Sequence, residues 1–132
     1  MDNVGTPPKA RVLVVDDSSL VRLYYRSALE KAGFAVEQAI NGIEAMERAL
    51  SQPFDLVIVD VNMPRMDGFT FLRALRSSAA GVAMLPALMI STESEIQDIA
   101  AARAAGANFY LVKPLSEAEL VRHVCVLTGA AS

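Results

Sequence analysis

The sequence is poor in the residues that build disulfide frameworks and histidine-centred sites. Its 132 residues contain one cysteine and one histidine. The single Cys125 excludes an internal disulfide and suits a reducing compartment, and we expect it to pack as a small hydrophobe. The single His123 excludes a histidine-rich metal cluster and a Ser-His-Asp triad. We expect a solvated role for it near the end of the last helix.

Long apolar runs and dense basic runs are also missing. No uninterrupted apolar stretch approaches the roughly 18 residues that a membrane span requires. The stretch Met1–Lys9 carries prolines and no apolar core, so it is not a signal peptide. The net charge is -3, and no clustered basic face is available for nucleic acid. We therefore expect a soluble, cytoplasmic protein with neither nucleic acid nor a membrane as a partner.

The chain does contain enough apolar residues for one packed domain. Hydrophobic residues make up 53% of the sequence and charged residues 20%, which favours a buried core over disorder. We predict a flexible tail over residues 1–9 and a single domain over residues 10–128. Only a few residues follow the last predicted helix, so we expect no attached output domain.

Short apolar runs alternate with longer amphipathic stretches along the chain. The runs predict strands at Arg11–Val15, Phe34–Ala39, Leu56–Val59, Ala87–Ile90 and Phe109–Val112. The amphipathic stretches predict helices at Ser18–Lys31, Gly42–Leu50, Asp67–Arg76, Glu93–Ala105 and from a cap at Ser116 to about Leu127. In the first two helices we expect the inward residues to be Leu20, Leu23, Tyr24, Ala28, Leu29, Ile43, Met46, Ala49 and Leu50. Five such alternations predict an α/β, doubly wound parallel sheet covered on both faces.

Four of the five predicted strands end in side chains that can take part in chemistry. They end in Asp16-Asp17, Asp60, Ser91-Thr92 and Lys113-Pro114. Each alone has a simpler interpretation as a helix cap or a turn residue, but parallel strands bring their carboxyl ends together at the edge where ligands bind. Three carboxylates there would repel one another unless Lys113 and a hard cation such as Mg²⁺ balance them. A carboxylate in that setting can act as a nucleophile and form an acyl phosphate.

These residues fall in motifs that resemble the response regulator receiver family. The motifs are V-L-V-V-D-D-S, then D-V-N-M-P-R-M-D-G over Asp60–Gly68, a strand-end serine, and K-P before the last helix. The resemblance runs from about Arg11 to Leu127 and is to stand-alone, CheY-like receivers. It implies a flavodoxin-like (βα)5 fold with the strand order 2-1-3-4-5. It also implies a sensor histidine kinase or a histidine phosphotransfer protein as the phosphoryl donor.

The resemblance implies a role for each acidic residue. Asp60 would be the phosphoacceptor of a two-component system, in a reaction that requires Mg²⁺. The ion would be bound by Asp17 and Asp60, by Asp16 through water, and by the main-chain carbonyl of Asn62. The chain would catalyse only its own phosphorylation and dephosphorylation, so it would not be an enzyme acting on another substrate.

The resemblance also implies a switch at the ends of the last two strands. The Ser91 hydroxyl would move to a phosphoryl oxygen, and the Tyr110 ring would follow it inward. Lys113 would pair with the phosphoryl group, and the Lys113–Pro114 peptide would be cis. Thr92 stands where several relatives have alanine, so we expect more restricted access to the phosphoryl group.

For the output, the Ser91–Ser94 stretch (S-T-E-S) and Asn62 resemble chemotaxis regulators. This favours phosphorylation-dependent binding to the flagellar motor switch. The binding face would combine the fourth predicted helix, the fifth strand and the fifth helix, beside Arg103 and Arg122. The alternative is a receiver outside motility: a phosphorelay shuttle, a phosphate sink or an adaptor.

Three rival interpretations fit the residues less well. A haloacid-dehalogenase-like phosphatase needs a second aspartate two residues after its nucleophile, where this chain has Asn62. A flavodoxin-like or P-loop nucleotide binder needs glycines and backbone donors after the first strand, where Asp16 and Asp17 would repel phosphate. A degenerate receiver that is never phosphorylated would not be expected to keep every chemical residue.

Overall fold

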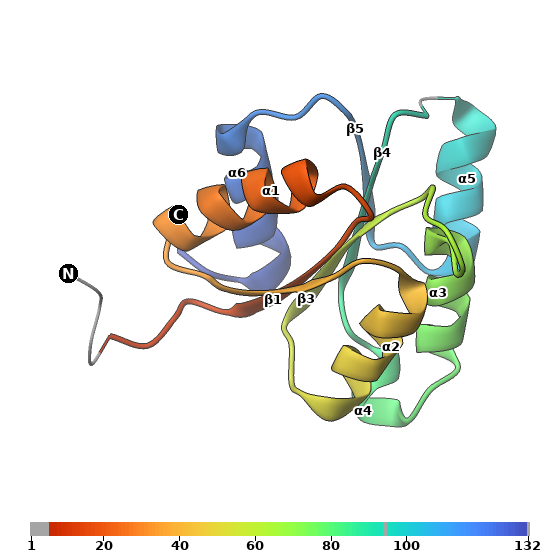
Figure 1. Ribbon diagram of the computed structural model, residues 1–132, viewed down its shortest axis with the longest axis horizontal. Coiled ribbons are helices and arrows are strands. Elements are labelled where there is room, and N and C mark those ends of the chain that lie inside the picture. The colour runs from red at the N-terminus through yellow and green to blue at the C-terminus, as the bar shows by residue number, and fades with distance from the viewer. Residues whose placement is uncertain (1–5, 94, 132) are drawn as a thin grey trace.

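The computed structural model describes residues 6–93 and 95–131, which form one five-stranded sheet flanked by helices (Figure 1). The strands are β1 (Arg11–Val15), β2 (Ala35–Ala39), β3 (Leu56–Asp60), β4 (Ala87–Ser91) and β5 (Phe109–Val112). The helices are α1 (Ser19–Lys31), α2 (Gly42–Ser51), α3 (Gly68–Arg76), α4 (Ala80–Ala83), α5 (Ile96–Ala105) and α6 (Glu117–Thr128). All neighbouring strands are parallel, in the order β2-β1-β3-β4-β5. This confirms the predicted fold class and strand order.

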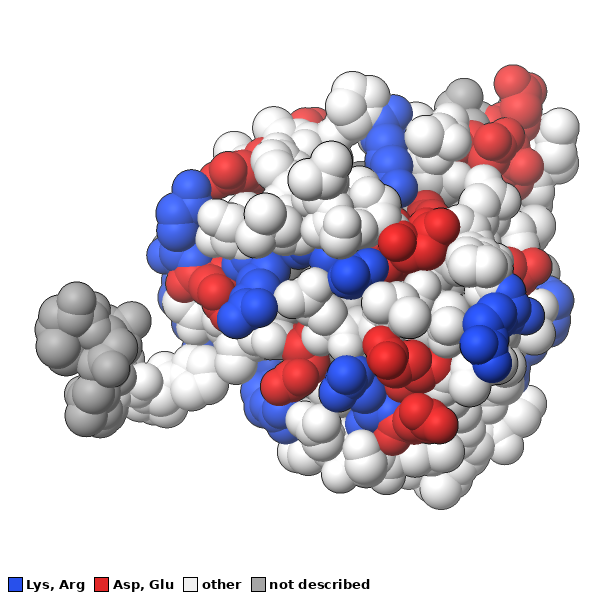
Figure 2. Space-filling model, in the orientation of Figure 1, with Lys and Arg blue, Asp and Glu red and all other residues white. Residues whose placement is uncertain are grey.

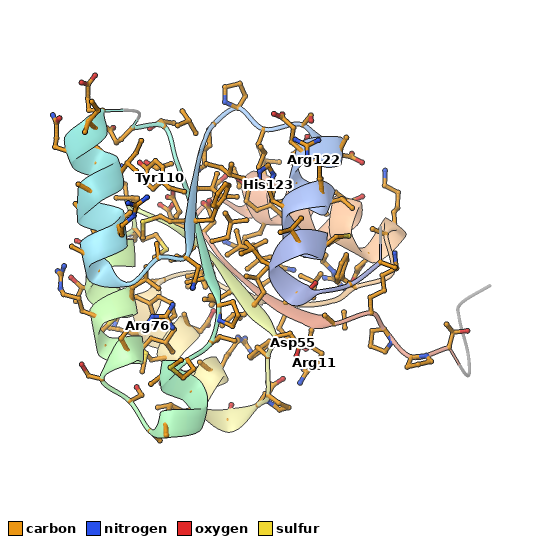
Figure 3. All side chains as sticks on the ribbon, turned by 180° about the vertical axis from the view of Figure 1, so that it is seen from behind. Arg11, Asp55, Arg76, Tyr110, Arg122 and His123 are labelled. Atoms are coloured by element: carbon orange, nitrogen blue, oxygen red, sulfur yellow. The ribbon has the colours of Figure 1, made fainter. Side chains whose placement is uncertain are left out.

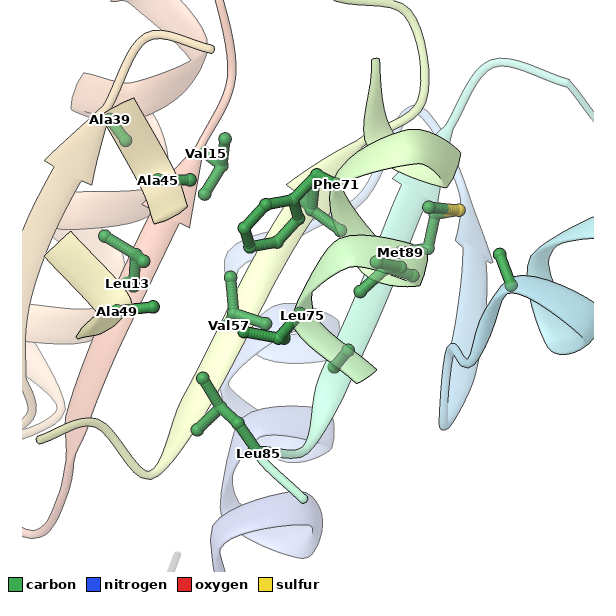
Figure 4. Close-up of a cluster of buried hydrophobic side chains, with 14 of the residues drawn as sticks. Leu13, Val15, Ala39, Ala45, Ala49, Val57, Phe71, Leu75, Leu85 and Met89 are labelled. Carbon is green, nitrogen blue, oxygen red and sulfur yellow. The ribbon is translucent and has the colours of Figure 1, made fainter. Parts of the chain in front are cut away.

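Two hydrophobic clusters hold the helices against the two faces of the sheet. On one face, α1 and α6 contribute side chains such as Leu29 and Cys125. On the other, α2, α3 and α5 pack over the sheet, with Phe71 and Leu75 of α3 near its centre (Figure 4). The strands β3 and β4 are buried along their whole length because they lie inside the sheet. The core therefore fixes the carboxyl ends of these strands, where the predicted site lies.

The inward faces of α1 and α2 were predicted wrongly in part. The predicted inward residues that are in fact exposed are Leu20 (77%), Leu23 (61%), Tyr24 (38%), Ile43 (38%) and Leu50 (58%). The prediction is confirmed for Ala28 and Leu29 of α1 and for Ala49 of α2, which are buried, and the helices also bury Tyr25 and Ala45, which were not predicted. Both helices carry apolar residues on two sides, and helical spacing alone does not say which side meets the sheet.

Several element boundaries also differ from the prediction. The helix α4 was not predicted, because its four residues are too few to show a helical period. The helix α5 begins at Ile96 rather than Glu93, and the Asp98 side chain accepts a hydrogen bond from the Glu95 main-chain N–H at 3.2 Å. Ser94, the last residue of the S-T-E-S motif, lies outside the described residues. The edge strands β2 and β5 are only partly covered, unlike the interior strands.

The N-terminal segment contacts the domain at Lys9. The Lys9 main-chain N–H donates to the Gly33 carbonyl at 2.9 Å, and the Lys9 ammonium lies 5.8 Å from the centre of the Phe34 ring. Residues 1–5 of the predicted tail lie outside the described residues. None of the helices described here is long and apolar enough to cross a membrane.

Arg76 of α3 lies near the amino-terminal ends of β4 and β5, at the end of the sheet opposite the predicted site (Figure 3). Its guanidinium donates to the carbonyls of Ala83, Leu85 and Gly106 at 2.9, 2.6 and 2.6 Å. Burial lowers the pKa of Arg76. These hydrogen bonds connect α3 to the segments that precede β4 and β5, and so they help to fix the positions at which the two strands begin.

Candidate functional site

The carboxyl edge of the sheet brings together three carboxylates and a lysine. One oxygen from each of Asp16, Asp17 and Asp60 lies within 4.8 Å of the others. The Lys113 ammonium lies 3.3 Å from Asp16 Oδ2 and 3.2 Å from Asp60 Oδ1. Residues that are far apart in the sequence thus form one acidic cluster with a single ammonium group between two of its members.

The strand register explains how these side chains meet. Val15 of β1 pairs with Val59 of β3, so the next residues, Asp16 and Asp60, stand side by side. Lys113 directly follows β5, which is separated from β3 by β4. A lysine has the length to span that intervening strand, whereas a shorter cation would not. Parallel pairing and side-chain length together therefore build the cluster.

Burial and like charge make the cluster electrostatically costly. Asp16 is 2% exposed and Asp60 is 8% exposed. Burial raises the pKa of Asp60, repulsion from Asp16 raises it further, and Lys113 only partly offsets both effects. Burial lowers the pKa of Lys113, but attraction and hydrogen bonds to Asp16 and Asp60 outweigh burial and raise it overall. Lys113 is therefore charged at neutral pH, but its single positive charge does not balance the negative charges of the three carboxylates.

The donor set fits Mg²⁺. Carboxylate oxygens are ligands that this hard cation prefers, and it binds through few protein groups while keeping several waters. The exposed Asp17 carboxylate accepts no hydrogen bond from the described residues, so its oxygens are available to an ion. Asn62, whose main-chain carbonyl the resemblance adds to the ligands, lies two residues after Asp60 and is exposed.

Asp60 is expected to destabilise the metal-free fold at neutral pH. Because its folded-state pKa is raised, its stabilising contribution is present in acid, below the unfolded pKa, and is lost as the pH rises through the folded pKa. Asp60→Asn should raise the free energy of unfolding at neutral pH by about 1–2 kcal/mol, the scale of a screened contact between like charges.

Urea unfolding without divalent metal measures this gain, which should shrink as the pH falls and Asp60 becomes protonated. Glu47→Gln removes the same charge from an exposed position on α2 and should change stability little. Equal stability of Asp60→Asn and wild type at neutral pH would show that the charged Asp60 carboxylate does not destabilise the fold.

The predicted switch residues are connected through one main-chain position. Ser91 ends β4 and is fully buried, and its hydroxyl accepts a hydrogen bond from the Glu93 N–H at 3.1 Å. The Glu93 carbonyl accepts from the Tyr110 hydroxyl at 2.7 Å. Tyr110 is half-buried against the core, so its ring already lies partly inward. Thr92 is exposed beside Ser91.

The loop after Asp60 is tightly folded. Gly68 is buried, and its N–H donates to the Val61 carbonyl at 2.9 Å. A Cβ at Gly68 would contact the Asp60 carbonyl oxygen. Arg65, at φ 73°, adopts the left-handed conformation. The Lys113–Pro114 peptide on the other side of the site is cis.

Residues of α1 that the sequence did not single out also line the site. Arg22 donates to the main-chain carbonyl of Asp16 at 2.7 Å. Tyr25 is buried below the cluster, and burial together with the charges of Asp16 and Asp60 raises its pKa. No sequence pattern marks Arg22, because its partner at the site is a main-chain carbonyl, a group that every residue carries. Helical spacing of the apolar residues indicated the neighbouring Tyr24 as inward, whereas the structure exposes Tyr24 and buries Tyr25.

The doubly wound sheet and the acidic cluster with its lysine are the features of a receiver domain of a two-component response regulator. The response regulator receiver domain model matches residues 12–125, so the chain belongs to this family. The transcriptional regulatory protein PrrA of Mycobacterium tuberculosis is 41% identical over 127 residues, which are 96% of this chain and 52% of PrrA. PrrA of Mycobacterium leprae is 42% identical over 117 residues, 89% of this chain and 49% of that protein.

Solved structures agree with this assignment. The structure of the chemotaxis protein CheY4 of Vibrio cholerae matches with a TM-score of 0.85 and 38% identity, over 89% of this chain and 98% of that one. A receiver domain of a Francisella response regulator matches with a TM-score of 0.84 and 27% identity, over 91% and 97%. The chain spans about half the length of the curated relatives it matches.

Proposed function

We propose that the chain accepts a phosphoryl group on Asp60 from a phosphohistidine of a sensor histidine kinase or a histidine phosphotransfer protein. The supporting observation is the convergence of Asp16, Asp17, Asp60 and Lys113 at one edge of the sheet. An Asp60 oxygen would attack phosphorus while the phosphorus–nitrogen bond breaks and its electron pair stays on the imidazole. The chain would catalyse only this step and the hydrolysis of its own acyl phosphate.

The residues around Asp60 would bind the phosphoryl group and the metal ion. Lys113 would pair with phosphoryl oxygens that arrive beside Asp60. Asp16, Asp17 and the Asn62 carbonyl would hold Mg²⁺ together with Asp60. When bound, the ion would neutralise charge on the phosphoryl oxygens.

An apolar surface beside the site suits a protein donor. A groove of 420 Å³ lies between α1 and the segment after β5, and Lys113 forms part of its wall; its lining also includes Leu20, Tyr24 and Leu115. Leu20, Leu23 and Tyr24 of α1 are all exposed apolar side chains, and Leu20 and Tyr24 line this groove together with Lys113. Leu23→Asp should slow transfer from a donor protein without changing labelling by acetyl phosphate. Equal slowing with both donors would place Leu23 outside the docking surface.

Incubation with acetyl phosphate and Mg²⁺, followed by intact-mass analysis, tests the proposed chemistry. The wild-type protein should gain one phosphoryl group, and a chelator should prevent the gain. Asp60→Asn should gain none. Asp67→Asn makes the same charge change at an exposed position in the same loop and should be labelled like wild type. Full labelling of Asp60→Asn would overturn the assignment.

We further propose that phosphorylation is recognised on the face formed by α5, β5 and α6. The exposed apolar side chains of these elements are Ile96 of α5, Phe109 and Val112 of β5, and Val126 of α6, and β5 is an edge strand of the sheet in the described residues. Tyr110 and Arg122 lie on the side of the molecule seen in Figure 3. When the Ser91 hydroxyl turns to a phosphoryl oxygen, it would release the Glu93 N–H and so disturb the main-chain position that holds Tyr110.

The similarity to CheY4, a chemotaxis protein, supports the flagellar motor switch as the output partner. The runner-up is a receiver outside motility: a phosphorelay shuttle, a phosphate sink or an adaptor. On the face in Figure 2, Lys and Arg side chains are separated by acidic and neutral ones, which favours a protein partner over nucleic acid. We also propose that the protein acts in the cytoplasm, where such kinases present their phosphohistidine.

Beryllofluoride, which mimics the phosphoryl group, tests the output proposal by amide chemical shifts. Shifts in the wild type should extend from Asp60 to Tyr110 and Arg103, and in Ser91→Ala they should stay near Asp60. Shifts that reach Tyr110 equally without the Ser91 hydroxyl would refute the coupling. Tighter binding of a motor-switch peptide to the beryllofluoride form would support chemotaxis, and unchanged binding would favour the alternative.

A further inference from the structure

Arg22 of α1 reaches back to the turn that carries the acidic pair. Its Nη1 donates to the main-chain carbonyl oxygen of Asp16 at 2.7 Å, and its Nε donates to Gln38 Oε1 at 3.0 Å. Gln38 belongs to β2, the strand that neighbours β1. The guanidinium therefore joins a helix, the end of one strand and the side chain of the next. Both distances lie in the usual range for N–H···O hydrogen bonds.

The Asp16 side chain is fixed as firmly as its carbonyl. One carboxylate oxygen accepts from the Ser18 N–H at 2.9 Å, and the other lies 3.3 Å from the Lys113 ammonium. The carbonyl that Arg22 holds belongs to the peptide that joins Asp16 to Asp17. Because a peptide is planar, fixing its oxygen also fixes the direction in which Asp17 leaves the turn.

We propose that Arg22 is a positioning residue for the acidic cluster and holds the Asp17 carboxylate where a divalent cation can bind it. This inference rests on the proposed function. The Asp17 side chain accepts no hydrogen bond from the described residues, so its place depends on its main chain. With the main chain in this position, one Asp17 carboxylate oxygen lies within 4.8 Å of carboxylate oxygens of Asp16 and Asp60. Arg22 acts through a main-chain carbonyl, and among the described residues its side chain donates only to that carbonyl and to Gln38, with no carboxylate as acceptor.

A purely electrostatic role for Arg22 would have the opposite consequence. A cation beside a metal site repels the incoming ion, so removing it should tighten Mg²⁺ binding. A positioning role predicts that removing Arg22 weakens binding, because Asp17 loses its fixed direction. The sign of the change in affinity therefore separates the two roles.

Calorimetric titration with Mg²⁺ measures that sign. Arg22→Ala should weaken the affinity by about tenfold, the loss typical when a group that orients a metal ligand is removed. Arg22→Lys should recover part of the loss, because an ammonium can donate to the same carbonyl. Arg26→Ala removes the same charge from the same helix, where Arg26 is exposed and paired with Glu30, and should leave the affinity unchanged. Unchanged or tighter binding by Arg22→Ala would overturn the inference.

Gln38→Ala tests the same link without removing a charge. It releases one end of the guanidinium, so it should weaken Mg²⁺ binding by a smaller factor and add nothing in the Arg22→Ala background. Should Arg22→Ala fail to fold, Gln38→Ala carries the test, and wild-type affinity there would overturn the role. Wild-type protein that binds no Mg²⁺ would refute the proposed function instead. Wild-type binding that is independent of Arg22 and Gln38 would refute only the positioning role.

Discussion

Replacing Lys113 with methionine is expected to slow the labelling of Asp60 by acetyl phosphate on the order of 100-fold, the scale for removing one preorganised donor from a reacting oxyanion. The Lys113 ammonium lies 3.2 Å from Asp60 Oδ1, where phosphoryl oxygens must arrive. Attraction to Asp16 and Asp60 overcomes the effect of burial and raises the pKa of Lys113, so the charge is present at neutral pH. Methionine keeps a long, flexible side chain without the charge.

The same substitution should leave the Mg²⁺ affinity at least as tight as in wild type, because it removes a cation from beside the metal site. A slow rate with intact metal binding separates a role in phosphoryl transfer from a collapse of the pocket. Lys31→Met removes the same charge from an exposed position, where Lys31 pairs with Glu117 on the surface, and should be labelled normally. A wild-type labelling rate in Lys113→Met would contradict its assigned role.

Replacing Gly68 with alanine is expected to destabilise the fold by about 1–3 kcal/mol, the usual cost of forcing an atom into a packed site. The added Cβ would contact the Asp60 carbonyl oxygen and would lie 3.1 Å from Met89 Cε. The methionine end can move, but the Asp60 backbone is part of β3. The start of α3 must therefore shift away from Asp60, and the labelling rate should fall with stability.

Gly81→Ala provides the matched control for this substitution. A Cβ at Gly81, which is exposed in α4, would meet open space beyond its own turn of chain in the described part of the protein. Its free energy of unfolding, measured with urea, should stay the same or rise slightly, since alanine favours the helix over glycine. Equal stabilities of the Gly68→Ala and Gly81→Ala proteins would show that the loop after Asp60 tolerates an added side chain.

The sheet could be predicted because interior parallel strands have a simple pattern of apolar residues in the sequence. The strands β3 and β4 are buried on both faces, so they read as unbroken apolar runs. The same logic located the cluster, because parallel strands deliver Asp16, Asp60 and Lys113 to one edge. The strand order itself came from the family resemblance, since composition and periodicity do not order the strands.

What the sequence did not predict depends on orientation and on single hydrogen bonds. Leu20 and Tyr25 have similar apolar character, yet one is exposed and the other buried, because only the docked angle of α1 decides between them. The link from Ser91 through Glu93 to Tyr110 uses main-chain groups that every residue carries. The bond from Arg22 to the Asp16 carbonyl is hidden for the same reason.

Phosphorylation of Asp60 is tested most directly by mapping the modified residue. After incubation with acetyl phosphate and Mg²⁺, borohydride reduces an aspartyl phosphate to homoserine, which peptide mass spectrometry then locates. We predict homoserine at position 60 alone, and none when Mg²⁺ is withheld. Homoserine at Asp16, Asp17 or Asp67, or a stable label on another residue with position 60 unmodified, would contradict the assignment of Asp60 as the phosphoacceptor.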